Sequence, residues 1–327
     1  MGNPTTAPPL VETRGLKKYF STPQGPLHAV DNVNITIARG ETLGLVGESG
    51  CGKSTLGRVV IRLLNPTAGS VFLDGHDIVN YGKEELRSFR RRAQMVFQDP
   101  YSSLNPRLSV EQLISEPLRI HKVFPNERET SARVKKLMDT VGLAQRLATS
   151  FPHELDGGRR QRIGVARALA LGPEFIVLDE PVSALDVCVQ AQILNLLHDL
   201  KDEFQYTYLF ITHDLSVVRH ISNRIVVMYL GKVIELADHL ELFENPQHPY
   251  TRALLSAIPV PRVDIARKGR IILEGDVPSP VNPPAGCRFY GRCPSRQDIC
   301  AVNAPELEEI SPDHFLACHF PVSTGGN

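Results

Sequence analysis

Short apolar runs alternate with longer amphipathic stretches along most of the chain. The runs LGLV at 43–46, QMVFQ at 94–98, EFIVL at 174–178 and YTYLFIT at 206–212 have the length and the branched or aromatic composition of strands. Helical patterns separate these runs. Strands that alternate with helices indicate an α/β fold, in which helices cover a largely parallel sheet.

One long segment, at about 99–160, departs from this alternation because its pattern is mostly helical. Amphipathic runs near 110–120 and 127–141 repeat apolar residues at helical spacing. We expect a helical insertion between two strands of the sheet. Two further helices are predicted over 53–64 and 158–172.

The composition changes near the C-terminus. The stretches PVPRVD at 259–264 and DVPSPVNPPAG at 276–286 are rich in proline and predict a linker or an extended arm. The pattern therefore divides the chain into a main domain at 1–258 and a C-terminal region at 259–327.

The charge balance limits the choice of partners. Lys and Arg number 36 and so do Asp and Glu, so no net field favours nucleic acid or an anionic membrane. The chain has no Trp, and no apolar run reaches the roughly 20 residues of a membrane helix. We expect no nucleic-acid partner, and we expect any membrane association to occur through other proteins.

A glycine-rich segment carries the clearest chemistry. GESGCGKST, which follows the strand LGLV, fits the G-x-x-x-x-G-K-[ST] pattern of a phosphate-binding loop (P-loop) between a strand and a helix. Its backbone N–H groups and the helix N-terminus would surround the phosphates of ATP. Lys53 is expected to reach the β- and γ-phosphates, and Ser54 to ligate Mg²⁺. The predicted phosphate-binding residues are Gly47, Glu48, Ser49, Gly50, Cys51, Gly52, Lys53, Ser54 and Thr55.

Acidic and polar residues follow the other predicted strands. FIVLDE, at 175–180, ends in Asp179, which could complete the Mg²⁺ shell, and Glu180, which could polarise the attacking water as general base. Gln98 could meet the metal or the water, and His213 the γ-phosphate. An acidic strand end is ordinary by itself, and a single histidine there is more often structural. The upstream P-loop makes the functional interpretation specific.

Two aromatic residues, Tyr19 and Phe20, precede the first predicted strand. Either ring could stack on adenine, since aromatic rings pack well against flat bases. Packing in the protein core is the simpler explanation for each, and the residues alone leave the choice open.

These motifs occur together in one order along the chain: the P-loop, Gln98, the pair Gly157 and Gly158, Asp179 with Glu180, SALD at 183–186, and His213. The series resembles the ATP-binding subunits of ABC transporters, over roughly residues 10–255. Further stretches are similar to the dipeptide/oligopeptide importer subfamily, and within it to the second of its two ATPase subunits: VFQDPYSSLNPR, PVSALDVCVQAQILNLL, ENPQHPYTRALLSAIP and GDVPSPVNPPAGC.

The resemblance implies a P-loop NTPase cassette with a RecA-like core, an antiparallel β subdomain, a helical subdomain and a small Cys-rich C-terminal appendage. It places the adenine-stacking ring at Phe20, with Tyr19 as the alternative, and supports Gln98 and His213 as site residues. In this family two ATPase subunits dock head to tail, so that each ATP lies between the P-loop of one and the LSGGQ signature of the other. Asp186 would lie at the seam of that dimer.

The same resemblance implies the partners: a second ATPase subunit, two transmembrane permease subunits and an extracytoplasmic substrate-binding protein. The chain would then be peripheral, at the cytoplasmic face of the membrane. Dipeptides or oligopeptides are the expected cargo, with nickel and sugars as alternatives in related importers. The alternative from another functional class is a soluble ABC ATPase that is not tied to transport and acts on nucleic acid or in translation.

The signature itself departs from the family. LDGGR, at 155–159, has Asp156 where the family has Ser and Arg159 where it has Gln. An ionised carboxylate cannot donate to a phosphate, and two charges ~4 Å apart repel by about 4 kcal/mol at an effective dielectric of 20. We therefore expect two unequal ATP sites in the dimer. The alternative is that Arg159 takes over the phosphate. Asp is a good N-cap residue, so the helix should still form.

Four of the six cysteines, Cys287, Cys293, Cys300 and Cys318, lie near the C-terminus. Thiolates are soft ligands for zinc or iron–sulfur clusters, but the spacing matches neither common zinc pairs nor ferredoxin runs. The resemblance implies a [4Fe–4S] cluster, with zinc or free buried thiols as alternatives. Cys51, within the P-loop, is expected to be a small packing residue.

Overall fold

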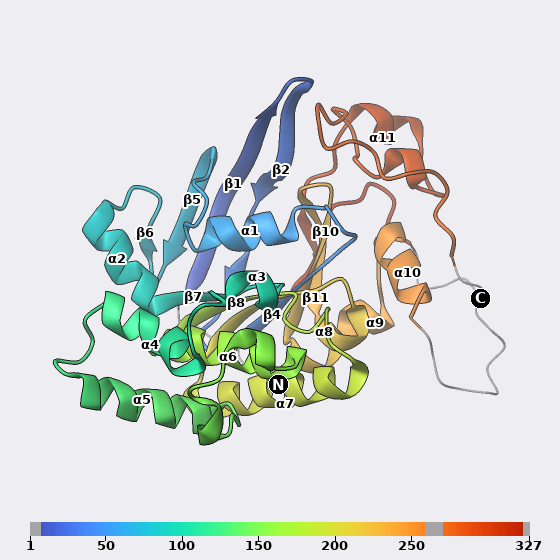
Figure 1. Cartoon of the computed structure of the whole chain (residues 1–327). Coiled ribbons are helices and arrows are strands. Elements are labelled where there is room, and N and C mark those ends of the chain that lie inside the picture. The colour runs from blue at the N-terminus through green and yellow to red at the C-terminus, as the bar shows by residue number, and fades with distance from the viewer. Residues whose placement is uncertain (1–7, 259–270, 323–327) are drawn as a thin grey trace, which may run out of the picture. The chain divides into compact units, whose positions relative to one another are not determined.

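The computed structural model of the chain describes residues 8–258 and 271–322; Figure 1 shows its elements. The predicted proline-rich stretch at 259–264 lies outside the described residues. The chain forms two compact units. The first comprises the described parts of Met1–Ala38, Thr42–Val79 and Thr212–Asn327, and the second comprises Arg39–Glu41 and Asn80–Ile211.

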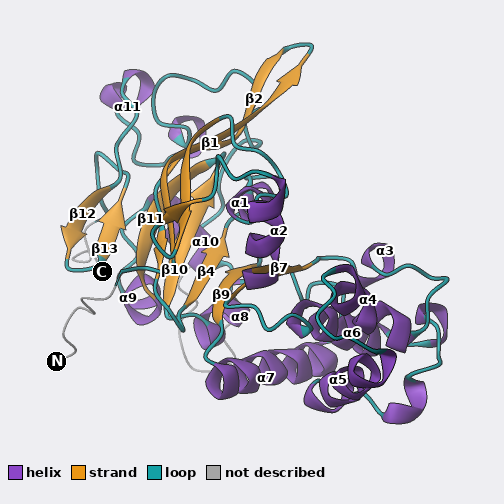
Figure 2. Ribbon diagram, turned by 90° about the vertical axis from the view of Figure 1, so that its left-hand side faces the viewer, coloured by secondary structure: helices purple, strands orange, loops and turns teal. Residues whose placement is uncertain are grey.

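The first unit contains an antiparallel sheet with the strand order β2-β1-β5-β6, and β3 pairs with β1. Along β1, Val11, Thr13 and Leu16 are buried, whereas Arg14 between them is exposed. This alternation is the expected pattern of a sheet with one covered face. Figure 2 shows β1 and β2 as a long hairpin. The strands are β1 (Val11–Thr22), β2 (Gly25–Val33), β3 (Thr36–Ile37), β5 (Ala68–Leu73) and β6 (His76–Asp77).

A second set of strands in the first unit has the order β12-β13-β11-β10-β4. β4 and β10 are parallel and almost wholly buried, and the other pairs are antiparallel. The C-terminal region joins this sheet through β13. These strands are β4 (Thr42–Val46), β10 (Arg224–Tyr229), β11 (Lys232–Asp238), β12 (Glu308–Ser311) and β13 (His314–Leu316).

Helices accompany these strands: α1 contacts β1 and β2, α8 packs on β4, and α9 packs on β10 and β11. A one-turn 3₁₀ helix, η3, precedes Cys293. The helices of the first unit are α1 (Lys53–Val60), α8 (Leu215–Ile221), α9 (His239–Glu244), α10 (Pro249–Ser256) and α11 (Asp298–Val302), and η3 spans Tyr290–Arg292.

The second unit has three parallel strands in the order β9-β8-β7 and a group of helices in which α4 and α5 both pack on α6. Side-chain caps begin α4 at Ser109 and α5 at Asn126. The elements are β7 (Ala93–Val96), β8 (Phe175–Asp179), β9 (Thr207–Ile211), α2 (Lys83–Arg92), α3 (Pro100–Ser103), α4 (Val110–Ile120), α5 (Glu127–Thr140), η1 (Gln145–Leu147), η2 (Pro152–Glu154), α6 (Gly157–Leu169) and α7 (Val187–Phe204).

The predicted elements are confirmed with shifts at their ends. The helix predicted over 53–64 is too long, because α1 ends at Val60 and Arg62 has a left-handed φ of 54°. The helix predicted over 158–172 ends at Leu169, before Gly172, whose φ is 63°. The division of the chain at residue 258 stays a prediction.

Three site residues lie elsewhere in the local structure than predicted. Tyr19 and Phe20 are inside β1, not before the first strand, because pairing with β2 continues as far as Thr22. Gln98 lies two residues beyond the end of β7, and so does not end a strand.

Candidate functional site

The P-loop connects β4 to α1 in the first unit. Gly47 has a φ of 152° and Gly52 a φ of 107°, and both approach neighbouring backbone closely. A Cβ added at Gly47 would lie 2.2 Å from the Met228 carbonyl oxygen, and one at Gly52 would lie 2.0 Å from the Ala29 carbonyl oxygen. No other residue fits these positions without moving the loop, so both glycines are required by geometry.

Lys53 is the first residue of α1 and is buried. Its Nζ donates to the carbonyl oxygens of Gly47, at 2.7 Å, and Glu48, at 2.9 Å. Ser54 and Thr55 follow in the first turn, and Ser49 and Gly50 form the exposed tip of the loop. The ammonium group thus lies inside a ring of backbone groups at a helix N-terminus, which is the arrangement that receives nucleotide phosphates.

Cys51 is buried within the loop, and its N–H donates to Glu48 O at 3.3 Å. Burial raises the pKa of its thiol, although Lys53 acts in the opposite direction. The thiol is therefore protonated at neutral pH, which favours its interpretation as a packing residue.

In the second unit, Asp179 ends β8 and is completely buried. Glu180 follows with a left-handed φ of 47° and donates its N–H to Ile211 O at 2.9 Å. Gln98 Nε2 donates to Glu180 Oε2 at 3.0 Å. The structure therefore brings Gln98 and Glu180 together. Left-handed residues other than glycine cost energy and cluster at functional sites, which agrees with the role predicted for Glu180.

The altered signature, LDGGR, lies at the start of α6. Asp156 is its N-cap: Oδ1 accepts from Arg159 N at 2.8 Å, and Oδ2 lies 3.4 Å from Arg159 Nε. The predicted N-cap is thus confirmed. Gly158 lies against α7, since a Cβ there would meet Val189 Cγ1 at 2.6 Å, and Gly157 lies near Leu185.

A hollow of about 360 Å³ in the second unit adjoins this helix start. Arg146, Arg159 and Arg162 contribute to its lining together with Asp156. The negative charge of Asp156 is therefore offset by its own Arg159, in a surrounding rich in cations.

The remaining predicted residues have distinct surroundings. Asp186 N-caps α7 by accepting from Val189 N at 3.0 Å. His213 is exposed and follows Thr212 in the first unit.

The two aromatic candidates differ in how far they are engaged. Tyr19 donates its hydroxyl to Asp31 Oδ1 and stacks on His28 with a centroid distance of 3.9 Å. Phe20 is 37% exposed, and Lys18 Nζ lies 5.0 Å from its ring centroid. The Phe20 ring is the more exposed of the two, which favours it over Tyr19 as the adenine platform.

The four C-terminal cysteines, Cys287, Cys293, Cys300 and Cys318, all line one small cavity. None of them forms a disulfide. Within residues 8–258 and 271–322, no group of three or more His, Cys, Asp or Glu side chains is gathered closely enough to hold a metal ion. The cavity shows that sequence-distant thiols converge, and the [4Fe–4S] cluster stays a prediction.

Two family models match separate parts of the chain. Residues 30–183 match the ABC transporter family, and residues 234–300 match the oligopeptide/dipeptide transporter C-terminal region. The chain is 53% identical over 319 residues to the oligopeptide transport ATP-binding protein AppF of Bacillus subtilis, covering 95% of this chain and 97% of that one. A putative peptide import ATP-binding protein of Brucella ovis is 51% identical over 313 residues, covering 96% and 98%.

The chain belongs to the ABC transporter ATP-binding proteins. A solved dimer of the ATP-binding cassette MJ0796, in a post-hydrolysis state bound to ADP and Pi, agrees in fold with a TM-score of 0.65 and 31% identity. It covers 70% of this chain and 98% of the cassette. The predicted P-loop NTPase cassette is thus confirmed, and this ABC protein is an ATPase.

One contact of the cassette was not predicted from the sequence. Arg292 Nη1 lies 2.8 Å from Glu48 Oε2, and so connects the C-terminal region to the P-loop. Glu48 was predicted as a phosphate-loop residue, but nothing in the sequence indicates a partner 244 residues away.

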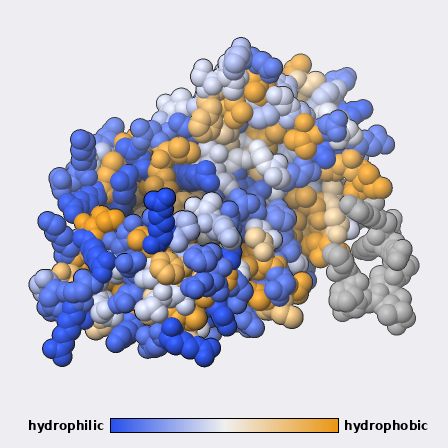
Figure 3. Space-filling model, in the orientation of Figure 1, coloured by the Kyte–Doolittle hydropathy of each residue, from blue (hydrophilic) through white to orange (hydrophobic). Residues whose placement is uncertain are grey.

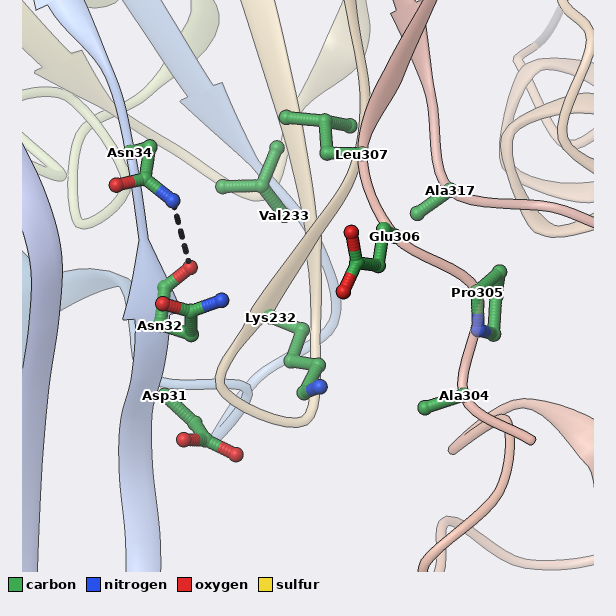
Figure 4. A pocket seen from close by; sticks show the side chains of 10 residues that line it. All are labelled: Asp31, Asn32, Asn34, Lys232, Val233, Ala304, Pro305, Glu306, Leu307 and Ala317. Carbon is green, nitrogen blue, oxygen red and sulfur yellow. Dashed lines mark hydrogen bonds between the residues drawn. The ribbon is translucent and has the colours of Figure 1, made fainter. Parts of the chain in front are cut away.

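A second hollow, of about 240 Å³, lies in the first unit and is lined by residues of β2, of β11 and of the C-terminal region (Figure 4). Lys232 and Glu306 extend toward it from opposite walls, and Asn34 Nδ2 donates to Asn32 O at 3.3 Å. It contains none of the predicted ATP-site residues. Its lining consists of Asp31, Asn32, Asn34, Lys232, Val233, Ala304, Pro305, Glu306, Leu307 and Ala317.

Proposed function

We propose that this ABC ATPase energises the import of dipeptides or oligopeptides through a membrane transporter. The observation that carries the cargo class is the C-terminal region, which matches the oligopeptide/dipeptide type over residues 234–300. The names of the relatives in Bacillus subtilis and Brucella ovis refer to peptide transport and peptide import. Nickel and sugar import are the alternatives that cargo measurements would separate.

The roles of the ATP-site residues follow from their chemistry. Lys53 binds the β- and γ-phosphates, Ser54 and Asp179 supply oxygen ligands for Mg²⁺, and Glu180 accepts a proton from the attacking water. Gln98 orients Glu180 and adds a contact to the metal. Bound Mg²⁺ would neutralise charge on the phosphates. His213 contacts the γ-phosphate, and Phe20 stacks on adenine.

We further propose that the chain works as one half of a heterodimer with a second ATPase subunit. Within it, the site completed by Asp156, Gly157, Gly158 and Arg159 hydrolyses ATP more slowly than the site built on this chain's own P-loop. Support comes from Asp156, whose two carboxylate oxygens accept from or pair with Arg159 and have no proton to donate. Asp186 contributes to the seam of the dimer.

The proposed complex also contains two permease subunits and an extracytoplasmic substrate-binding protein, with this chain at the cytoplasmic face of the membrane. No helix among the described residues is long and apolar enough to span a bilayer. In the face shown in Figure 3, the part formed by α2 and α5 is mostly hydrophilic.

The four-cysteine cavity is proposed to hold a [4Fe–4S] cluster. Four cysteine thiols line this one cavity, and four thiolates are the ligand set of a [4Fe–4S] cluster. Zinc is the alternative. Iron and acid-labile sulfide are to be quantified in protein purified without oxygen. Zinc bound in place of both would overturn this assignment.

The function is tested by purifying the complex that contains this chain and reconstituting it in liposomes with its binding protein. ATP-dependent uptake of labelled di- and oligopeptides is measured against nickel and sugars. Peptide uptake that is lost in the Lys53→Ala variant is the expected result. Uptake of nickel or sugar alone would overturn the peptide assignment and leave the ATPase assignment intact.

A further inference from the structure

Each polar group of Glu48, the second residue of the P-loop, makes a hydrogen bond or an ion pair. Its N–H donates to Tyr250 Oη at 2.9 Å, and its carbonyl oxygen accepts from Lys53 Nζ at 2.9 Å. Its carboxylate receives Arg292 Nη1 at 2.8 Å. These contacts lie within the first unit. The backbone position of Glu48 therefore determines one of the two carbonyl groups on which the Lys53 ammonium group rests.

The contacts to the N–H and to the carboxylate of Glu48 both come from segments outside the P-loop. Tyr250 belongs to α10 and is fully buried, and Arg292 ends η3 directly before Cys293. The Arg292 side chain is 10% exposed and that of Glu48 is 26% exposed. An ion pair that is largely shielded from water is stronger than a surface pair and is screened less by salt.

An aromatic cluster fixes Tyr250 and the segment that carries Arg292 with respect to one another. The rings of Tyr229, Tyr250 and Phe289 meet edge to face, with centroid distances of 4.8, 5.2 and 5.5 Å. Phe289 lies three residues before Arg292, and its buried neighbour Arg288 donates to the carbonyl oxygen of Leu230. The segment that carries Arg292 is thus anchored on β10 and α10, and not attached through the ion pair alone.

We propose that Arg292 and Tyr250 are positioning residues for ATP binding, through which the four-cysteine segment holds the P-loop in its phosphate-binding shape. Neither residue needs to touch the nucleotide. Arg292 acts through the carboxylate of Glu48 and Tyr250 through its N–H, and both set the Glu48 carbonyl that Lys53 contacts. Because burial raises the pKa of the Tyr250 phenol, its oxygen is a neutral acceptor at physiological pH.

This inference rests on the proposed ATP-binding role of the P-loop and predicts a specific kinetic signature. A misplaced P-loop binds ATP less well, while Glu180 and the water are unaffected. In the assembled complex, Arg292→Ala should therefore raise the KM for ATP about tenfold with kcat within about twofold of the parent. Arg292→Lys, which keeps the charge, should recover part of the loss. Tyr250→Phe, which keeps the ring, should raise KM by about threefold.

Two comparisons separate positioning from general damage. Arg296→Ala removes an exposed arginine of the same segment that contacts Tyr290 and Gly291 but not the P-loop, so its KM should stay at the parent value. In a double-mutant cycle, adding Glu48→Ala to Arg292→Ala should raise KM little further, since both variants remove the same contact. Should Arg292→Ala fail to fold, Glu48→Ala alone provides the measurement, with the same expected rise in KM.

The outcomes distinguish this inference from the function on which it rests. If the unaltered complex hydrolyses ATP and Arg292→Ala leaves KM unchanged, or lowers only kcat, the positioning role is wrong and the ATPase assignment stands. An equal rise in KM for Arg296→Ala would also overturn it. If the unaltered complex neither binds nor hydrolyses ATP, the proposed function fails first.

Discussion

Gln98 and Glu180 are joined by a hydrogen bond of 3.0 Å between side chains that lie 82 positions apart in the sequence. Each follows a strand of the same parallel set, Gln98 after β7 and Glu180 after β8. Parallel strands bring residues beyond their carboxyl ends to one edge of the sheet, which is where ligands bind in α/β proteins. The amide of Gln98 can thus orient the carboxylate that is to act on water.

Removing the general base should stop hydrolysis without preventing nucleotide binding. Glu180→Gln keeps the shape of the side chain but removes its basicity, so kcat should fall by about 10²–10⁴-fold. The equilibrium dissociation constant for MgATP should change little. Steady-state hydrolysis and calorimetric binding measure the two effects. Gln98→Ala, which removes only the orienting donor, should reduce kcat less; a larger loss for this variant would contradict the assigned roles.

The P-loop glycines should differ sharply in their tolerance of a methyl group. Gly52→Ala places a carbon 2.0 Å from the Ala29 carbonyl oxygen, so the loop must move. We expect a loss of about 3 kcal/mol in the free energy of unfolding, together with loss of ATP binding.

Gly50→Ala is the matched control, because Gly50 also has a positive φ, of 78°, but nothing lies within 4 Å of the added Cβ. Only the cost of a left-handed alanine, about 1 kcal/mol, is then expected. Chemical denaturation measures both variants, and equal losses would contradict the steric argument.

The sequence predicts local features of the site well and distant contacts poorly. The P-loop and the N-cap at Asp156 follow from a few neighbouring residues, because loops and helix ends are built from local hydrogen bonds. The ion pair between Glu48 and Arg292 spans 244 positions and depends on how the C-terminal region packs. Sequence alone carries no signal for such a contact.

The choice between Tyr19 and Phe20 shows the same limit. Both are aromatic and adjacent, and the residues leave the adenine platform open. Only the fold shows that Tyr19 contacts Asp31 and His28 whereas Phe20 is partly exposed. Alternation along a strand places neighbours on opposite faces, but which face is occupied depends on tertiary structure.

Buried His248 should make the protein less stable in mild acid. Its Nδ1 accepts from Tyr250 N at 3.1 Å, and burial lowers its pKa from the ordinary 6.5 to about 4, with the nearby Glu235 acting weakly in the opposite direction. Between these two pH values the unfolded chain binds a proton that the folded chain does not. The free energy of unfolding should therefore fall as pH decreases from about 6.5 to about 4, by about 3 kcal/mol in total.

His248→Asn tests this expectation, because asparagine can accept the same N-cap hydrogen bond but does not titrate. Its stability measured by denaturation should depend less steeply on pH in that window, even where the absolute stability is lower. His314 does not mask the effect. Burial is the largest single influence and lowers its pKa, but the hydrogen bonds and negative charges of Glu235 and Glu241 together raise the pKa above 6.5. The stability that His314 contributes is therefore lost as the pH rises above 6.5, not as it falls below. An unchanged slope in His248→Asn would refute the assignment.

Restoring a hydroxyl at the signature should reveal whether the two ATP sites are unequal. Asp156→Ser gives α6 a side chain that still caps the helix, since serine is as good an N-cap residue as aspartate. It also supplies a donor for a phosphate and removes the negative charge beside Arg159. Under single-turnover conditions, the parent complex should hydrolyse one nucleotide rapidly, and Asp156→Ser should hydrolyse two.

The matched control is Asp238→Ser, which makes the same change at the N-cap aspartate of α9, a residue outside the predicted ATP site and the dimer seam. It should preserve α9 and leave the slow site slow, so a second rapidly hydrolysed nucleotide is expected from Asp156→Ser alone. Thermal unfolding of both variants checks that the helices remain intact. If stoichiometry and rate are the same in the parent and in Asp156→Ser, Arg159 already compensates for the carboxylate, and the two sites are equivalent.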